Sequence, residues 1–232
     1  MMSPGEKTIG ILGGMGPEAT AELFLRIIRA AKAKRDQDHP RVIIYSNSKI
    51  PDRTGAILHG GPSPLPMMVE TGRALQRAGA DFLIMPCNTA HHYFQELQEA
   101  LEVPVLHMID LSARVAQALG VGRVGLLATD GTLATGLYQE SYDRFQVETL
   151  APSPQDQKRV MEAIYTHIKA GDLEEGRKLI LEVSRALIQE GAEAVVCGCT
   201  EVSLVLRQGD LEVPVIDPME TLAEEAVKLA KG

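Results

Sequence analysis

Tryptophan is missing from this sequence of 232 residues, and aromatic residues make up only 4% of it. Surfaces that stack nucleic-acid bases therefore have little material to be built from. Lysine and arginine number 23, are scattered along the chain, and are outnumbered by acidic residues, which leaves a net charge of −8. That balance argues against electrostatic binding to the phosphate backbone of a nucleic acid, so we expect no nucleic-acid partner.

Long apolar runs are also lacking. No stretch approaches the roughly 20 consecutive apolar residues that cross a bilayer, and the N-terminus has no apolar segment of the secretory type. Cysteine is scarce: there are three, and two of them stand almost adjacent as Cys197 and Cys199. A secreted disulfide framework normally uses more cysteines, in pairs, in a smaller chain. We expect a soluble cytoplasmic protein with no membrane partner, whose thiols are reduced.

What is present is a regular alternation of short aliphatic runs with longer segments of helical period. The aliphatic runs include TIGILGG, RVIIYSNS and DFLIMP in the first half, then VGRVGLLAT, AEAVVCG and VPVID in the second. A strand–helix–strand connection nearly always returns in parallel, so this alternation predicts an α/β fold with mainly parallel sheets flanked by helices. Sites in such folds collect at the carboxyl ends of strands.

The two halves of the chain resemble each other around two cysteines. Gly79-Ala80-Asp81 leads through an apolar strand to Cys87, and Gly191-Ala192-Glu193 leads through another to Cys199, in both cases 112 positions later in the sequence. Such an echo indicates an internal duplication. The two cysteines therefore occupy equivalent positions of a repeat.

A second echo sets the limits of the repeat. Val103-Pro104-Val105 returns as Val213-Pro214-Val215, 110 positions later. We infer two similar α/β lobes related by an approximate twofold, with the active-site cleft between them. The first lobe is expected at residues 1–106 plus 216–232 and the second at residues 107–215, so that the C-terminal helix packs on the first lobe.

Cys87 and Cys199 each follow an apolar strand and precede a helical segment. Asn88, Thr89 and Thr200 are residue types that cap helix N-termini, so both sulfurs are expected beside a helix start. There, unpaired N–H groups and the macrodipole lower a thiol pKa from about 8.5 toward neutrality. Across a twofold, one thiolate removes the Cα proton of an amino acid while the other thiol protonates the opposite face.

Other interpretations of the cysteines and histidines have less support. A buried cysteine is often a small core hydrophobe, which is the interpretation we adopt for Cys197. A Cys-x-Cys zinc site completed by His91 or His92 finds little support in the spacing. A cysteine–histidine hydrolase would leave the second cysteine without a purpose, whereas His91 near Cys87 suits the tuning of its thiolate.

The turn after the first strand, residues 14–19, formally matches a dinucleotide fingerprint. That fingerprint also requires an acidic residue at the end of the second strand, where this chain has Ser-Asn-Ser. We therefore expect a tight turn, with Pro17 at the first position of a helix, and no nicotinamide cofactor.

The strings IGILGGMGPEAT, NSKIPDRT, MPCNTAHHYF and GCTEVSLV, in this order and across essentially the whole chain, resemble the aspartate/glutamate racemase superfamily, and specifically its aspartate racemase branch. The resemblance implies a cofactor-independent racemase, with neither pyridoxal phosphate nor metal, that interconverts the L- and D-forms of a small acidic amino acid. It also implies a homodimer. Members that act on glutamate or on a broader range of amino acids carry similar motifs, so these specificities stay open beside aspartate.

The same resemblance implies a role for individual residues. Cys87 and Cys199 are the paired acid and base. The remaining residues bind the substrate: Asn88, Thr89 and Thr200 hold its α-carboxylate, Met15 and Gly16 line the cleft, and Arg53 and Lys169 recognise its side-chain carboxylate. A planar guanidinium fork such as that of Arg53 suits a carboxylate independently of any family. Lys169, beside Gly171, equally suits the C-terminal cap of a helix.

Three functional classes remain. The first is an amino acid racemase, and the second is another two-thiol reaction of the superfamily, such as maleate cis-trans isomerisation or arylmalonate decarboxylation. The third is a non-catalytic amino acid-binding regulator, which the presence of both cysteines disfavours. The strings Asn-Thr-Ala-His and Pro-Asp-Arg-Thr favour the first class.

Overall fold

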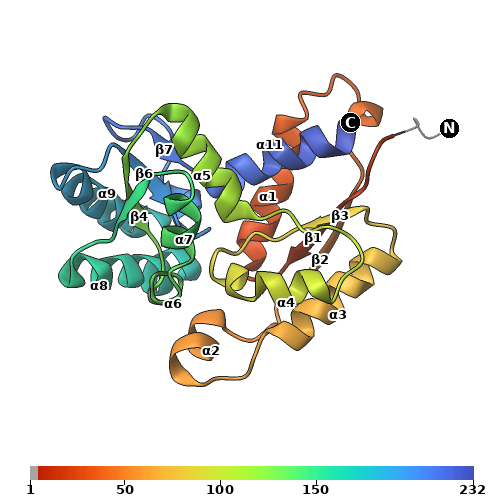
Figure 1. Cartoon of the computed structure of the whole chain (residues 1–232), viewed down its shortest axis with the longest axis horizontal. Coiled ribbons are helices and arrows are strands. Elements are labelled where there is room, and N and C mark those ends of the chain that lie inside the picture. The colour runs from red at the N-terminus through yellow and green to blue at the C-terminus, as the bar shows by residue number, and fades with distance from the viewer. Residues whose placement is uncertain (1–4) are drawn as a thin grey trace. The chain divides into compact units, whose positions relative to one another are not determined.

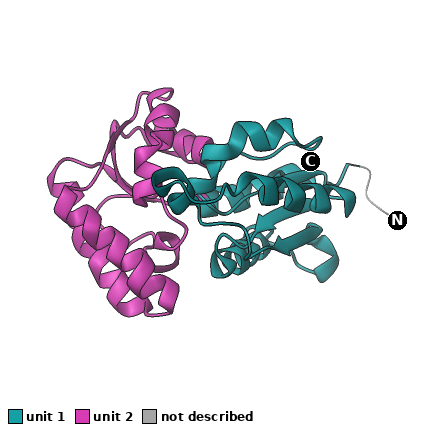
Figure 2. Cartoon of the chain, turned by 90° about the horizontal axis from the view of Figure 1, so that it is seen from below, with its two compact units in different colours: residues 1–108, 219–232 teal, residues 109–218 magenta. Residues whose placement is uncertain are grey.

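The computed structural model describes residues 5–232 and divides into two compact units (Figure 2). Unit 1 comprises the described residues up to Met108 together with Met219–Gly232, and unit 2 comprises Ile109–Pro218. Each unit has one sheet in which every strand pairing is parallel. The predicted α/β class, with two parallel sheets flanked by helices, is therefore confirmed.

The sheet of unit 1 is centred on β1 (Ile9–Gly13), which pairs with β2 (Val42–Ser46) on one side and β3 (Phe82–Ile84) on the other. All five residues of β1 are buried, as expected for the central strand of a covered parallel sheet. A single parallel bridge between Leu83 and Val105 continues the sheet beyond β3. The carboxyl ends of β1, β2 and β3 therefore lie at one edge of this sheet.

Helices cover both faces of this sheet (Figure 1). Helix α1 (Pro17–Ala30) and helix α11 (Pro218–Lys231) lie on one face, and α3 (Leu65–Arg77) and α4 (Phe94–Glu99) lie on the other. Pro17 stands at the start of α1, as the sequence predicts, where its missing N–H costs no hydrogen bond. The short helix α2 (Arg53–His59) follows β2.

Helix α11 comes after unit 2 in the chain but packs on unit 1. The Lys7 N–H donates to the Ala230 carbonyl at 2.9 Å, and Lys231 Nζ donates to the Ala31 carbonyl at 2.6 Å. Met219 and Leu222 of this helix are fully buried. Unit 1 is therefore completed only by the last residues of the chain.

The sheet of unit 2 has the order β5-β4-β6-β7. Its strands are β4 (Arg123–Leu127), β5 (Glu148–Leu150), β6 (Ala194–Cys197) and β7 (Val215–Ile216). In both sheets the first strand is central, the second flanks it on one side and the third on the other. The Leu83–Val105 bridge of unit 1 corresponds to the Val195–Val215 pair of unit 2, so the strand topology repeats as the sequence does.

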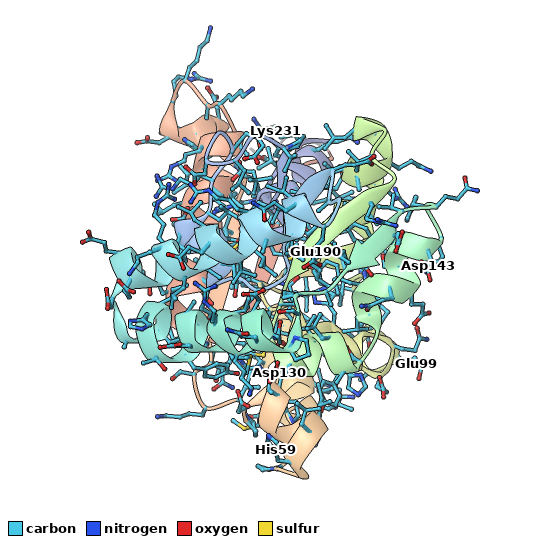
Figure 3. All side chains as sticks on the ribbon, turned by 90° about the vertical axis from the view of Figure 1, so that its left-hand side faces the viewer. His59, Glu99, Asp130, Asp143, Glu190 and Lys231 are labelled. Atoms are coloured by element: carbon cyan, nitrogen blue, oxygen red, sulfur yellow. The ribbon has the colours of Figure 1, made fainter. Side chains whose placement is uncertain are left out.

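The helices of unit 2 are α5 (Met108–Leu119), whose first residue belongs to unit 1, α6 (Asp130–Ala134), α7 (Leu137–Asp143), α8 (Pro154–Glu162), α9 (Leu173–Gln189) and α10 (Val202–Val205). Helices α5 and α7 bury their apolar residues in one core cluster with β4 and β6, whereas α8, α9 and α10 contribute to another. Figure 3 labels residues at helix ends of both units, among them Asp130, Asp143 and Lys231. Within the described residues, none of the helices has the length and apolar character needed to span a membrane.

Candidate active site

Cys87 lies just beyond the carboxyl end of β3, where the sequence predicts it. It is 5% exposed and belongs to the same buried cluster as Met15, Ile50 and Met68. Its backbone N–H donates to the Met85 carbonyl at 2.9 Å, which closes a tight turn directly after the strand. The thiol therefore stands at a sheet edge with little contact with water.

The segments that follow the two cysteines differ from the expected helix starts. Residues Thr89–Tyr93 form a 3₁₀ turn before α4, and α10 is only four residues long. Asn88 makes no side-chain capping bond, and its backbone (φ −61°, ψ −52°) is already helical, whereas an N-cap residue needs an extended backbone. Thr200 precedes Glu201, which occupies the N-cap position of α10, and the backbone of Glu201 is helical too. The prediction that Asn88 and Thr200 cap helices is wrong, although both side chains are buried beside the sulfurs.

His91 acts on Cys87 through the backbone. Its Nδ1 donates to the Cys87 carbonyl at 2.8 Å, and its Nε2 accepts the N–H of Met108, the first residue of α5, at 3.1 Å. Burial, with a smaller effect of the nearby His107, lowers the pKa of His91 to about 3, so the ring is neutral. Both ring nitrogens are thereby engaged by backbone groups rather than by the sulfur. Among residues 5–232 no group of three or more His, Cys, Asp or Glu side chains is placed to hold a metal ion.

Arg53 and Met15, two of the predicted substrate-binding residues, are brought together in unit 1. Arg53 is the first residue of α2, and the side chain of Asp52 caps that helix by accepting the Gly55 N–H at 2.6 Å. The Arg53 guanidinium donates to the Met15 carbonyl at 3.2 Å and to the Pro51 carbonyl at 3.1 Å. The guanidinium is therefore fixed next to the turn after β1.

That turn depends on glycine. Gly14 has φ +95°, a conformation that favours glycine, and a Cβ there would lie 2.2 Å from the backbone of Asn47. The Thr20 hydroxyl of α1 accepts the Gly14 N–H at 2.9 Å and donates to the Gly16 carbonyl at 2.8 Å. These contacts place Met15 and Gly16 at the carboxyl end of the central strand.

Cys199 follows β6 in unit 2 and has a different environment from Cys87. Its Sγ donates to Glu201 Oε2 at 2.9 Å, and the Thr200 hydroxyl donates to the same oxygen at 3.3 Å. The other oxygen of Glu201 accepts from Lys169 Nζ at 2.6 Å. Cys199 and Glu201 are each 7% exposed, so a buried thiol and a buried carboxylate are connected to a partly exposed ammonium.

This environment raises the pKa of the Cys199 thiol, whereas the sequence predicts a lowered pKa. Burial and the negative charge of Glu201 raise the pKa of the Cys199 thiol well above its usual value. Burial also acts to raise the pKa of Glu201, but the charge of Lys169 outweighs it and holds this pKa below the usual value. The prediction of a lowered thiol pKa is wrong for Cys199, because the thiol is buried and the Glu201 carboxylate lies beside it.

Lys169 lies in the 3₁₀ turn Ile168–Ala170, immediately before Gly171, which has φ +89°. The charge of Glu201 raises the pKa of Lys169 against the opposing effect of burial. Glu201 is a residue to which the sequence reasoning gave no role. The available signal was an acidic residue inside the apolar string GCTEVSLV, because a carboxylate buried in such surroundings needs a cation as partner. Cys197, fully buried at the end of β6, is core packing as expected.

Comparison with known proteins extends over both units. The model of the Asp/Glu/hydantoin racemase family matches residues 12–226. The broad specificity amino-acid racemase RacX of Bacillus subtilis (strain 168) is 27% identical over 223 residues, which cover 94% of this chain and 96% of that protein.

Solved structures give the same result. The aspartate racemase of Picrophilus torridus has a TM-score of 0.89 at 33% identity and covers 97% of this chain and 94% of its own. An aspartate racemase homologue from Pyrococcus horikoshii OT3 has a TM-score of 0.80 at 28% identity, over 97% of this chain and all of its own. The chain is therefore an enzyme of the Asp/Glu/hydantoin racemase family.

Proposed function

We propose that this enzyme is an aspartate racemase that interconverts L- and D-aspartate by proton transfer at Cα between Cys87 and Cys199, without pyridoxal phosphate or metal. The observation that carries the proposal is that the two cysteines follow equivalent strands, β3 and β6, in two sheets of the same topology. Both thiols are buried, which removes water from competition for the proton.

The proposed reaction needs the two sulfurs on opposite faces of one Cα. One cysteine, as thiolate, takes the Cα proton, and the electron pair of the C–H bond passes into the carbanion. The other cysteine, as thiol, delivers its proton to the opposite face, so that the configuration is inverted and the two sulfurs have exchanged protonation states. Reaction from the other enantiomer exchanges the two roles.

A thiolate is a weak base for a Cα proton, so the site must stabilise the charge that develops on the α-carboxylate. Asn88, Thr89 and Thr200 are candidates for this role because they adjoin the two sulfurs and are buried, with exposed fractions of 3%, 7% and 2%. Donors fixed in a dry site interact more strongly with developing charge than donors in water. Positioning of both thiols supplies a further part of the rate.

An acidic side chain is the substrate feature that this site suits. Arg53 is held beside Met15, at the strand end that also contributes Gly16. The Lys169 side chain is 33% exposed, so its ammonium can contact a ligand while it holds Glu201. The similarity to the aspartate racemase of Picrophilus torridus, at 33% identity, supports aspartate over other acidic amino acids.

A second candidate is a racemase of broader specificity. It is supported by the similarity to RacX, which spans 94% of this chain at 27% identity. The two candidates differ in one respect: the first requires a marked preference for aspartate over neutral amino acids, and the second does not.

Hydrogen–deuterium exchange at Cα tests the proposal. The enzyme is incubated in D₂O with L-aspartate, L-glutamate or neutral amino acids, and loss of Cα–H is followed by NMR together with the enantiomeric ratio by chiral chromatography. We expect exchange and racemisation with aspartate, and neither with the variant Cys87→Ala/Cys199→Ala. Absence of exchange with any amino acid would overturn racemisation, and equal rates with neutral amino acids would favour the broader enzyme.

A further inference from the structure

The contacts of Cys199 do not resemble those of Cys87, although the two strand ends are equivalent. Only 2.9 Å separates the Cys199 sulfur from a carboxylate oxygen of Glu201, and only 2.6 Å separates the other oxygen from the Lys169 ammonium. A carboxylate accepts hydrogen bonds and has none to donate when ionised, so the proton in the contact with Cys199 belongs to the sulfur. The geometry thus specifies a thiol at Cys199.

We propose that Glu201, held as a carboxylate by Lys169, keeps the proton on Cys199, so that Cys199 enters the reaction as the proton donor. The catalytic meaning of this inference rests on the proposed racemase function. Its structural basis, a carboxylate bonded to a buried thiol on one side and to an ammonium on the other, does not depend on that function.

The groups around Cys199 come from several elements, and burial and the charge of Glu201 outweigh the opposing charge of Lys169. Glu201 from its own turn opposes a thiolate by charge repulsion, and the buried Tyr138 of α7, whose pKa is raised by burial, brings no positive charge. Lys169 is the cation of this group, and its ammonium donates a hydrogen bond to Glu201. The same ammonium lies 5.5 Å from the centre of the Tyr165 ring. The net effect on Cys199 is that of a carboxylate in a dry site.

This arrangement makes the two protonation forms of the enzyme unequal. The form with the proton on Cys199 is the more populated, and it is the form that accepts the enantiomer whose Cα–H faces Cys87. When Cys199 has given its proton to Cα, a thiolate and a carboxylate are left side by side, and their repulsion favours return of a proton to the sulfur. Because the enantiomers are equally stable, the asymmetry appears in kcat and KM separately and not in their ratio.

Thiol alkylation tests the inference without relying on racemisation. The enzyme is treated with iodoacetamide over a range of pH, and peptide mass spectrometry follows Cys87 and Cys199 separately. A neighbouring charge shifts a pKa by roughly 1 to 3 units. In Glu201→Gln, which keeps the shape and loses the charge, we expect the alkylation midpoint of Cys199 to fall by at least about one pH unit. Below that midpoint, alkylation of Cys199 should become about tenfold faster, because the thiolate fraction changes tenfold per pH unit.

Two comparisons make the result specific. Glu190→Gln removes the same charge from an exposed position at the end of α9, and it should leave the Cys199 midpoint in place. Cys87, in the other unit, is the internal control within each sample. If Glu201→Gln fails to fold because Lys169 is left unpaired, Glu201→Gln/Lys169→Met removes the pair without leaving an unpaired charge and should lower the midpoint as well.

The two possible failures can be told apart. An unchanged Cys199 midpoint in a folded Glu201 variant would overturn the role of Glu201, even if aspartate is racemised. A shifted midpoint in a protein that exchanges no Cα–H would leave Glu201 as the residue that holds the Cys199 proton and would overturn the racemase assignment instead.

Discussion

At the scale of single residues, the two cysteines occupy equivalent strand ends but unlike surroundings. Cys87 belongs to a buried apolar cluster with Met15 and Met68, and its carbonyl accepts a hydrogen bond from His91, whereas the Cys199 thiol donates to a carboxylate. A two-base mechanism tolerates this difference, because each thiol has to act on one face only. It also means that removal of either thiol should leave a distinct partial reaction.

Single alanine variants of the two cysteines should separate these partial reactions. Cys87→Ala and Cys199→Ala should each lose racemisation, because inversion needs a group on both faces. Each variant should still exchange the Cα–H of one enantiomer with D₂O, with retention, and the enantiomer should differ between the two variants. NMR of L- and D-aspartate in separate incubations measures this. Cys197→Ala, in the core of unit 2, is the control and should retain racemisation. Full racemisation by Cys87→Ala or Cys199→Ala would contradict the two-thiol mechanism.

His91 should make the stability of the protein depend on pH. Its pKa is about 3 in the folded protein and about 6.5 in an unfolded chain, so below pH 6.5 the unfolded state binds a proton that the folded state does not. The free energy of unfolding should therefore fall as pH falls from about 6.5 to 3, by up to about 1.4 kcal/mol per pH unit. Above pH 7 this contribution should be constant.

Urea unfolding at several pH values, compared with His91→Asn, measures this contribution. The asparagine amide can still donate to the Cys87 carbonyl but does not titrate. Wild type should lose stability relative to the variant as pH falls below 6.5. The exposed His59 at the end of α2 offers His59→Asn as a control, which should run parallel to wild type. Parallel curves for wild type and His91→Asn would contradict the buried neutral imidazole.

At the scale of elements, the sequence is informative where long-range pattern decides the structure. Alternating strands and helices predict the parallel sheets, and the 112-residue echo predicts that Cys87 and Cys199 follow equivalent strands. The short turns after the cysteines are not predictable in this way. Asn88 is a good capping residue by type, yet its backbone is helical in the folded chain, because the turn after β3 decides its conformation.

The ion pair of Glu201 is a second feature that the sequence pattern does not predict. The string GCTEVSLV indicates that its carboxylate is buried, but the cation that balances it lies 32 positions earlier in the sequence. Pattern within a segment carries no information on such a pairing, which arises from the packing of the turn at Lys169 against the turn after β6. The roles of Arg53, Asn88, Thr89 and Lys169 toward substrate stay predictions.

The cap of α2 gives a prediction at this scale. Asp52 accepts the Gly55 N–H at 2.6 Å and so fixes the first turn of the helix that begins with Arg53. Asp52→Ala should cost about 1 kcal/mol of stability. It should also raise KM for aspartate, because the first turn of α2 no longer holds Arg53 in a fixed position. Ser153→Ala is the matched control: Ser153 caps α8 by accepting the Asp156 N–H, and its loss should cost similar stability without a change in KM. Urea unfolding and steady-state kinetics of both variants provide the measurement. An equal change in KM in both variants would contradict a specific role of α2 in substrate binding.

At the scale of the whole molecule, each unit is completed by a helix that follows the other unit's sheet in the chain. Helix α11 follows β7 and packs on unit 1, and α5 follows the strand residue Val105 and packs in the core of unit 2 with β4 and β6. Both helices come after a Val-Pro-Val string, at Val103-Pro104-Val105 and Val213-Pro214-Val215. The duplication therefore makes α5 and α11 equivalent.

That equivalence predicts that the chain tolerates a circular permutation between its halves. Joining residue 232 to residue 5 is geometrically easy, because Lys7 and Ala230 are already hydrogen-bonded at 2.9 Å. Opening the chain after Gly120, an exposed residue between α5 and β4 with no neighbour near its would-be Cβ, makes α5 the C-terminal helix in place of α11. The permuted protein should fold with nearly wild-type stability and should keep its racemase activity, as circular dichroism, thermal unfolding and the exchange reaction would report.

Deletion of residues 218–232 should have the opposite result, because it uncovers the surface of unit 1 that α11 buries. Met219 and Leu222 are fully buried in this helix, and burial of each such side chain contributes about 1.5–3 kcal/mol. Their loss alone removes a large part of the roughly 5–15 kcal/mol that holds a protein folded. A deletion variant with native circular dichroism and unchanged thermal stability would contradict this.

A permuted protein that fails to fold while the wild type refolds would show that α5 and α11 are not interchangeable, and that the order in which the two units are completed matters.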